Sequence, residues 1–452
     1  MNNQAPSSGA HASILRGALA SLGVRLFDLP SRYGFHLLVA ASLGVMESGR
    51  FYIVFSIVNT LAGFGRLGVD RALTRQLAVD TASGREGGVR PATRSAMRVV
   101  VLMSLVATAL LAGFATPVAD FVMHKPDLAL PMMLGALAIL PQNLSTVVAG
   151  GLAGLHRVGY SQMVYSWLWP AIFCVAALPL VFLKQFTVLH ALLLMAASFV
   201  MAAGVGAVLL RRFLSPYPNT GHAAHEKQHF LARGLSFFTL ELTQLMIAAV
   251  PAIALGIAAS PQQTGLFALA WRIALINLLF INGVTGMAAP KFAALHARND
   301  LHGLNRSAAQ AIGLVLCLAL PVTACMLLFP ERLLAVFGPG YSAGATTLRI
   351  LAIGQLVAAC FAGMPDLLGM TAHLAALRTI NFISLGVLLV GLLVLVPTGG
   401  SMGAAVATSL AIAFNAAAAG WAAHRLLGLF PLATVWHGLL IRLRPARGGS
   451  GS

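Results

Sequence analysis

Residues 25–71 read RLFDLPSRYGFHLLVAASLGVMESGRFYIVFSIVNTLAGFGRLGVDR. Two apolar runs long enough to cross a membrane are interrupted here by Arg25, Arg32 and Arg66. An ionised side chain at the centre of a membrane helix costs about 2.5–3.5 kcal/mol on insertion scales. Arginines kept in such helices are therefore expected to face a polar cavity, and the stretch predicts a membrane protein whose interior receives an anion.

The rest of the chain has the same apolar character. Of its 452 residues, 58% are hydrophobic and 9% are charged, and the mean hydropathy is +0.86, values that exclude a soluble globular domain. Apolar runs of about 18–25 residues predict an all-α polytopic membrane protein with about twelve transmembrane helices. The expected helices cover residues 15–45, 50–70, 96–118, 128–153, 160–183, 187–210, 234–258, 265–290, 307–329, 344–369, 379–397 and 402–424.

The net charge of +17 is explained by topology rather than by a nucleic acid partner. With the N-terminus inside, most of the 29 lysines and arginines fall in segments on the cytoplasmic side, as the positive-inside rule requires. We therefore expect both termini to be cytoplasmic, no nucleic acid partner, and a basic rim that attracts anionic membrane lipids.

The chain repeats itself at one constant offset. Gly49-Arg50-Phe51 returns as Gly265-Leu266-Phe267, and Arg75 returns as Lys291. The repeat predicts two pseudo-symmetric six-helix lobes, a geometry suited to alternating access. The expected organisation is an N-terminal lobe over 1–210, a cytoplasmic linker over 211–233, a C-terminal lobe over 234–427 and an amphipathic tail over 428–452, whose last residues resemble an artificial linker.

Charged residues of the first lobe fall into helical stripes. At about 100° per residue, Arg25, Asp28 and Arg32 share one face of the first expected helix, and the same spacing places Asn59, Arg66 and Asp70 on one face of the second. These stripes predict a substrate-binding cavity. The alternative is that Asp28 with Arg32, and Arg66 with Asp70, are ion pairs at i,i+4 that only make polar helices tolerable.

The second lobe supplies further candidates. By the repeat, Glu241 and Gln244 are equivalent to Arg25 and Asp28, and the opposite charges suggest that Glu241 faces Arg25. Arg272 and the nearby Asn277 are also expected to bind substrate, whereas Arg349 lies near a helix end.

One motif points to an enzyme. Residues 225–229, His-Glu-Lys-Gln-His, match the H-E-x-x-H pattern of zinc proteases. They lie in the polar linker without a convincing third ligand, so a histidine-rich linker is the favoured interpretation, and whether His225 and His229 bind metal stays open. No cofactor and no catalytic residues are expected.

Several segments resemble the polysaccharide transporter family of lipid-linked oligosaccharide flippases. They are Gly49-Arg50-Phe51 through Arg75, Gly265 through Ile273, Val336 through Tyr341 with Leu348 through Ala352, and Gly400 through Thr408. This family belongs to the multidrug/oligosaccharidyl-lipid/polysaccharide superfamily. The resemblance covers residues 15 to 427.

The resemblance implies a twelve-helix, two-lobed fold in the bacterial inner membrane and a flippase that moves undecaprenyl-diphosphate-linked oligosaccharide from the cytoplasmic to the periplasmic leaflet. Relatives bind the diphosphate through arginines that correspond to Arg25, Arg32, Arg66 and Arg272. The absence of two extra C-terminal helices favours the O-antigen or exopolysaccharide branch over the lipid II branch. A glycan polymerase and other assembly proteins are expected partners.

Transport is expected to be coupled to the membrane potential, to H+ or to Na+, with Asp28, Asp70 or Glu241 as candidate carriers. The main alternative is a multidrug antiporter for organic cations on the same fold. A membrane-embedded glycan-assembly enzyme or scaffold is a more remote one.

Overall fold

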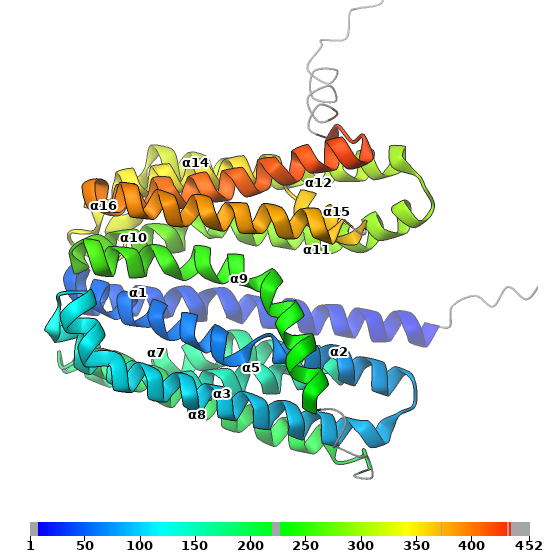
Figure 1. The fold of residues 1–452 in the computed structure, drawn as a ribbon, viewed down its shortest axis with the longest axis horizontal. Coiled ribbons are helices and arrows are strands. Elements are labelled where there is room, and N and C mark those ends of the chain that lie inside the picture. Colours follow the sequence, from blue (N-terminus) through cyan, green and yellow to red (C-terminus); the bar gives the residue numbers. More distant parts are fainter. Residues whose placement is uncertain (1–7, 219–226, 372, 432–433, 435–452) are drawn as a thin grey trace, which may run out of the picture. The chain divides into compact units, whose positions relative to one another are not determined.

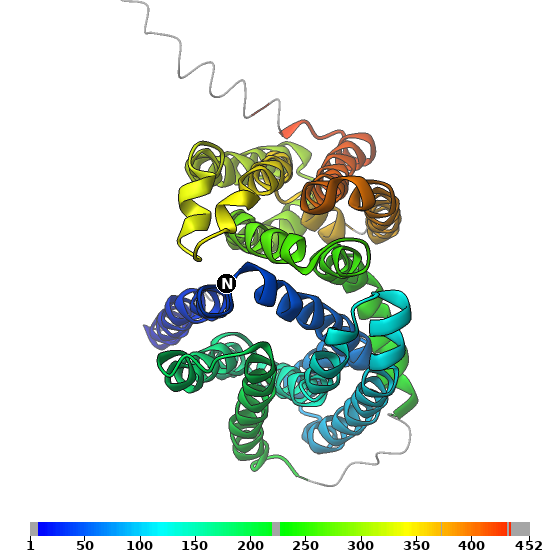
Figure 2. The ribbon, with the colours of Figure 1, turned by 90° about the vertical axis from the view of Figure 1, so that its left-hand side faces the viewer.

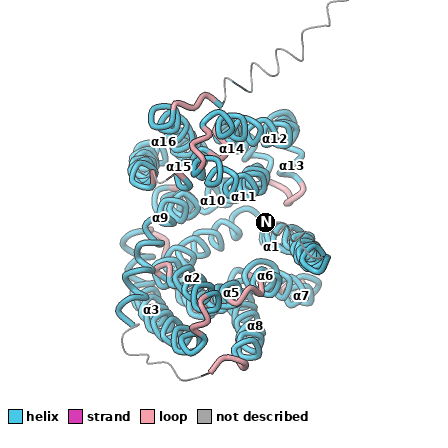
Figure 3. The backbone as a smooth tube through the Cα atoms, turned by 90° about the vertical axis from the view of Figure 1, so that its right-hand side faces the viewer, coloured by secondary structure: helices cyan, strands magenta, loops and turns pink. Residues whose placement is uncertain are grey.

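The computed structural model describes the backbone of residues 8–218, 227–371, 373–431 and 434, and their side chains except 8–26, 227–233, 236, 237, 239 and 240. Throughout this part of the chain the secondary structure is helical, with no strands (Figures 1 and 3). Ten segments of it are long and apolar enough to cross a membrane. The protein is therefore a multi-pass membrane protein, as predicted.

The chain divides into two compact units, Met1–Ala249 and Val250–Ser452, and the helices of each unit pack side by side (Figure 2). The first unit contains α1 (Ser8–Arg66), α2 (Val69–Ala82), η1 (Glu86–Gly88), α3 (Val89–Pro117), η2 (Val118–Val122), η3 (Pro126–Leu128), α4 (Ala129–Ala136), α5 (Ile139–Gly154), α6 (Val158–Gln162), η4 (Met163–Trp167), α7 (Leu168–Phe182) and α8 (Val188–Leu214). Helix α9 (Lys227–Ala258) contributes its residues up to Ala249 to this unit.

The second unit continues with α10 (Pro261–Ala274), α11 (Ile276–Ala297), α12 (Leu301–Leu328), α13 (Pro330–Ala335), η5 (Tyr341–Gly344), α14 (Ala345–Cys360), α15 (Met364–Met370) and α16 (Leu374–Leu427). Its core is built around Phe292, Leu304, Ile312 and Leu367, all fully buried.

Two of the ten membrane-length segments each contain two helices. Inside α1, Gly44 has φ 72° and ψ 177°, and inside α16, Gly400 has φ 51° and ψ −129°, so neither residue is helical. Glycine adopts such backbone angles without the steric cost that a Cβ brings. Each glycine divides its segment in two, and the ten segments therefore correspond to the twelve predicted helices.

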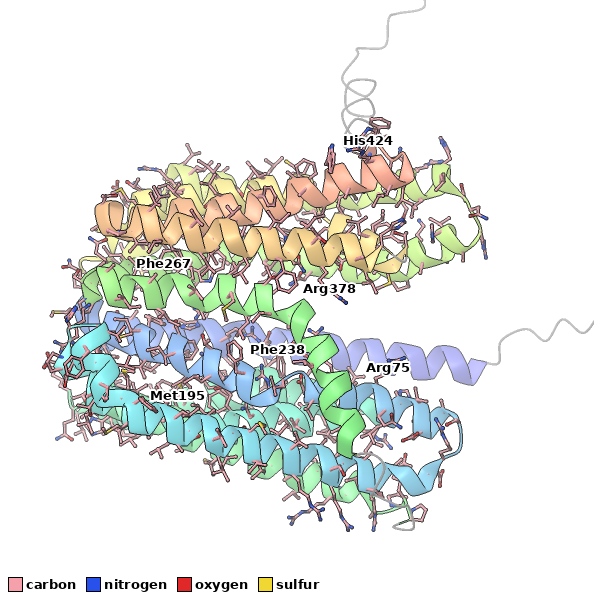
Figure 4. All side chains as sticks on the ribbon, in the orientation of Figure 1. Arg75, Met195, Phe238, Phe267, Arg378 and His424 are labelled. Atoms are coloured by element: carbon pink, nitrogen blue, oxygen red, sulfur yellow. The ribbon has the colours of Figure 1, made fainter. Side chains whose placement is uncertain are left out.

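The division between the units falls inside α9, after Ala249. The first part of α9 packs closely on the end of α1. A Cβ on Gly63 would come within 2.5 Å of Leu245, and the rings of Phe64 and Phe238 lie 5.2 Å apart. Figure 4 labels Phe238 on α9 and the fully buried Met195 on α8. This packing explains why the start of α9 belongs to the first unit.

Candidate functional site

A cavity of about 660 Å³ lies within the first unit. Its walls come from the end of α1, from α2, α5, α6, η4 and the first part of α9. Unusually for a membrane-spanning unit, the lining includes two arginines and two acidic residues. The lining residues are Arg66, Asp70, Arg71, Thr74, Thr146, Ala149, Gly150, Ala153, Ser161, Tyr165, Glu241, Gln244 and Leu245.

A turn between α1 and α2 determines how the charged side chains of these two helices reach the cavity. The helix predicted over 50–70 ends at Arg66, because Leu67 and Gly68 both have positive φ, at 48° and 70°. Helix α2 then starts at Val69. The prediction of one continuous helix here was wrong, and Arg66 and Asp70 reach the same cavity from the last turn of α1 and the first turn of α2.

Arg66 and Asp70 are not hydrogen-bonded to each other in the described structure. Arg66 donates Nη1 to Thr146 Oγ1 over 3.4 Å. Asp70 has a buried Oδ1 atom for which no hydrogen-bond donor is found among the described residues. A buried acceptor without a donor is costly, so this oxygen is suited to a donor or a proton supplied from the cavity.

Arg71 of α2 and Glu241 of α9 form an ion pair through Nε and Oε1. The Arg71 side chain is 56% exposed and that of Glu241 is 26% exposed, so the pair sits at an accessible part of the wall. Asp70 and Arg66 are also close enough to Glu241 for their charges to act on it. We expected Glu241 to face Arg25, whose side chain lies outside the described residues; the partner in the structure is Arg71.

Helices α2 and α5 approach closely beside the cavity. A Cβ on Gly150 would lie 2.8 Å from the carbonyl oxygen of Asp70, so the two backbones are nearly in contact. Thr74 Oγ1 donates within 2.9 Å of the carbonyl oxygens of both Asp70 and Gly150. This contact fixes the start of α2, and with it Asp70 and Arg71, against α5.

The other predicted residues of the first unit lie outside this cavity lining. Asp28 and Arg32 form an ion pair on α1 over 3.1 Å, with the Arg32 side chain 47% exposed. Asn59 accepts a hydrogen bond from Gln142 over 2.8 Å and donates to the carbonyl of Phe55. The stripe that joined Asn59 to Arg66 and Asp70 does not extend across the break at Leu67.

In the second unit, the predicted residues occupy separate environments. Asn277 is fully buried and donates to Thr323 Oγ1 over 2.9 Å. Arg272 lies half-buried in the last turn of α10. Arg349 donates Nε to the carbonyl oxygen of Leu327 over 3.2 Å, a contact with the end of α12.

Several cavity residues were not among the predicted ones. Arg71 is one of them, although its position directly after Asp70 could have suggested the cavity. Tyr165 lies in η4, whose five residues form a π-helix in place of the regular helix expected over 160–183. Short π-helical segments are frequent at functional sites, but no sequence pattern predicts this one.

The H-E-x-x-H motif lies outside this site. His225 and Glu226 fall outside the described residues, as does the side chain of His229. In the part of the chain that is described, no group of three or more metal-binding side chains comes together.

Comparison with known proteins identifies the family. The sequence profile of the polysaccharide biosynthesis protein family matches residues 14–296, well over half of the chain. The chain belongs to this family. Among curated proteins no sequence matches significantly.

Solved structures with the same fold include both flippases and transporters. The lipid II flippase MurJ, in an inward closed conformation, has a TM-score of 0.72 at 11% identity, over 95% of this chain and 93% of that one. An inward-facing multidrug resistance MATE family transporter of the MOP superfamily has a TM-score of 0.68 at 14% identity, over 92% and 99%.

A MOP superfamily transporter from Pyrococcus furiosus, described as having a binding pocket of reversed polarity, has a TM-score of 0.58 at 16% identity, over 92% and 95%. At these identities the likeness concerns the fold. This member of the polysaccharide biosynthesis family thus has the fold of MOP superfamily transporters and of a lipid II flippase, confirming the family and fold that we predicted.

Proposed function

We propose that the protein is a flippase that moves undecaprenyl-diphosphate-linked oligosaccharide from the cytoplasmic to the periplasmic leaflet of the bacterial inner membrane by alternating access. The family, the fold and the intramembrane arginines support this function. The most direct support is the cavity of about 660 Å³ in the first unit, whose lining includes Arg66 and Arg71.

In this proposal the diphosphate binds Arg66 and Arg71. A guanidinium forms bidentate, charge-assisted hydrogen bonds with phosphate oxygens, which replace the hydration that the headgroup loses. Arg71 is already paired with Glu241, so the substrate competes with a carboxylate for this arginine. This competition favours release of the diphosphate, because the ion pair between Arg71 and Glu241 then forms again.

The energy of transport comes from the membrane potential, from H+ or from Na+. Moving one negative charge outward across an inside-negative membrane releases about 2.3 kcal/mol per 100 mV. Asp70 is the strongest candidate for a proton or cation carrier, since its buried Oδ1 lacks a donor among the described residues. The polyprenyl tail stays in lipid, both termini are cytoplasmic, and a glycan polymerase takes up the product.

Reconstituted flipping tests the arginine assignment. Proteoliposomes carrying a fluorescent undecaprenyl-diphosphate sugar report how fast the label changes leaflet. Arg66→Gln and Arg71→Gln should each slow flipping by about tenfold or more, because a hydrogen bond to a charged group contributes roughly 1.5–3 kcal/mol. Arg75→Gln is the matched control, since Arg75 lies one turn after Arg71 on α2, is exposed and does not line the cavity. Wild-type flipping by a folded Arg66→Gln protein would refute the assignment.

A cation antiporter is the second candidate, favoured by the two carboxylates in the cavity and by the MATE-like fold. In that case Asp70 and Glu241 would bind an organic cation, and the arginines would only balance their charge. Ethidium efflux from the same proteoliposomes separates the two functions. The antiporter would be established if the wild-type protein exports ethidium but does not flip the lipid-linked sugar, and if Asp70→Asn loses the ethidium efflux.

A further inference from the structure

A second cavity, of about 560 Å³, opens between α3 and α8 of the first unit. It shares no lining residue with the transport cavity. Its lining combines four arginines with a few apolar side chains, and the described residues that line it include no acidic group. The lining residues are Arg90, Thr93, Arg94, Met97, Arg98, Ala207, Leu210, Arg211 and Leu214.

The arginines of this basic cleft are placed by helical spacing. Arg90, Arg94 and Arg98 recur every four residues and so lie on one face of α3, with Arg211 of α8 opposite them. Like charges at i,i+4 repel each other, and an anionic group placed between them would reduce this repulsion. Arg90 is held in position, because it donates to the carbonyl oxygens of Leu214 and Ser215 over 3.0 and 2.9 Å at the end of α8.

An apolar groove of about 560 Å³ adjoins the basic cleft. The two share Met97 and Ala207 in their walls, so they lie next to each other. The groove runs between α3 and α8, both of which pack on α4 and α5. Its remaining lining residues are Leu105, Thr108, Leu137, Leu140, Pro141, Leu144, Val148, Val200, Ala203 and Gly204.

The dimensions of the combined site fit a phospholipid. Arg98 and Thr108 are ten residues apart on α3, which is about 15 Å along a helix. The hydrocarbon core of a bilayer is about 30 Å thick, so the groove extends through about one leaflet. The cleft lies at the ends of α3 and α8 where the positive-inside rule places the cytoplasm, so that leaflet is the cytoplasmic one.

We propose that this site binds one anionic phospholipid, with its phosphodiester headgroup among the arginines of the basic cleft and an acyl chain in the apolar groove. Basic pockets between transmembrane helices on the cytoplasmic side are known to hold anionic headgroups. Such a lipid would place its negative charge beside the arginines of the basic cleft and fill the space between α3 and α8. The occupant belongs to the membrane and is distinct from the transported molecule.

Native mass spectrometry measures how much lipid stays bound to the protein, and this amount tests the headgroup part of the site. The protein is reconstituted in vesicles of phosphatidylcholine and phosphatidylglycerol in equal amounts and extracted into mild detergent. The wild-type protein should retain phosphatidylglycerol in preference to phosphatidylcholine. Arg211→Gln should lower retained phosphatidylglycerol about fivefold, the factor that corresponds to about 1 kcal/mol per basic residue near an anionic surface.

Arg212→Gln is the matched control, because Arg212 is the adjacent residue, is exposed and does not line the basic cleft. It should retain phosphatidylglycerol like the wild-type protein. Equal retention by Arg211→Gln and Arg212→Gln, or equal retention of the two lipids by the wild-type protein, overturns the proposal.

A second variant separates a lipid from a free phosphate ion. A Cβ on Gly204 would meet nothing within 4 Å and Gly204 lines the apolar groove, so we expect the side chain of Gly204→Leu to enter the groove. Gly204→Leu, on α8, should lower retained phosphatidylglycerol. Gly113→Leu should not, because Gly113 is an open glycine on α3 that lies outside the groove. Stabilisation of the protein by inorganic phosphate, with lipid retention unchanged in Gly204→Leu, would show that only the anion binds. Because the transport cavity shares no residue with this site, a failed flipping assay leaves this result unaffected.

Discussion

Arg71 and Glu241 form an ion pair that joins α2 to the first part of α9. The two residues are far apart in the sequence and meet at the wall of the 660 Å³ cavity of the first unit. Because both side chains are partly exposed, the pair contributes less than about 1 kcal/mol to stability. In the proposed function, this pair controls how available Arg71 is to the diphosphate.

Glu241→Gln should tighten the binding of a lipid diphosphate several-fold and slow its release, because the variant removes the carboxylate that competes for Arg71. Binding of a fluorescent undecaprenyl-diphosphate sugar to detergent-solubilised protein measures the affinity, and the proteoliposome assay measures the rate. The gain in affinity should vanish in the double variant Arg71→Gln with Glu241→Gln. Weaker binding by Glu241→Gln alone would mean that Glu241 itself contacts the substrate.

Gly150→Ala should destabilise the first unit and impair transport. The added methyl group would lie 2.8 Å from the carbonyl oxygen of Asp70 and 3.1 Å from Thr74 Oγ1, so α2 has to move away from α5. Overpacking of this kind costs about 1–3 kcal/mol. The thermal unfolding midpoint in detergent should fall by several degrees, with flipping reduced in parallel.

Gly159→Ala provides the control for this packing effect, because a Cβ at Gly159 would meet nothing within 4 Å. An unfolding midpoint unchanged in both variants would contradict the close approach of α2 and α5.

The fold was predictable because hydrophobic length and the positions of charges are local properties. The twelve apolar segments follow from them. Arg66, Asp70, Glu241 and Gln244 were selected as intramembrane polar residues, and the structure places all four on one cavity. Arg66 and Asp70 were selected by their charge in an apolar run, whereas Glu241 and Gln244 were selected through the repeat. Neither selection needs knowledge of the residues' partners.

The pairing of these residues was not predictable. The helical periodicity that connected Asn59 to Asp70 holds only within one helix, and the positive φ angles of Leu67 and Gly68 end it. The partner of Glu241 depends on where α9 packs, which the repeat does not specify. Asn277 illustrates a related limit, because a buried amide that binds Thr323 looks the same in sequence as one that binds substrate.

Gly400→Ala should destabilise the second unit. The residue has φ 51°, which costs an L-residue roughly 1–2 kcal/mol, and its added methyl group would lie 3.0 Å from Gln263 Oε1. That oxygen accepts a hydrogen bond from the Ser401 backbone over 2.9 Å, so the contact that holds the break would also be disturbed.

The neighbouring Gly399 is the control, since a Cβ there has open space and its φ is ordinary. Gly399→Ala should keep the wild-type unfolding midpoint, whereas Gly400→Ala lowers it. Equal midpoints would show that α16 does not need a glycine at its break.

Variants of the Asp28–Arg32 pair test whether the part of α1 before Gly44 takes part in binding. If Arg32 binds the diphosphate, Arg32→Ala should abolish flipping, whereas Asp28→Asn, which releases Arg32 from its partner, should keep or raise substrate affinity. If the pair only makes a polar helix tolerable, both variants should flip at the wild-type rate, since an exposed ion pair contributes less than about 1 kcal/mol. Membrane insertion and the unfolding midpoint are measured alongside, so that loss of the fold is not mistaken for loss of binding. Wild-type flipping by a folded Arg32→Ala protein would exclude Arg32 from the diphosphate site.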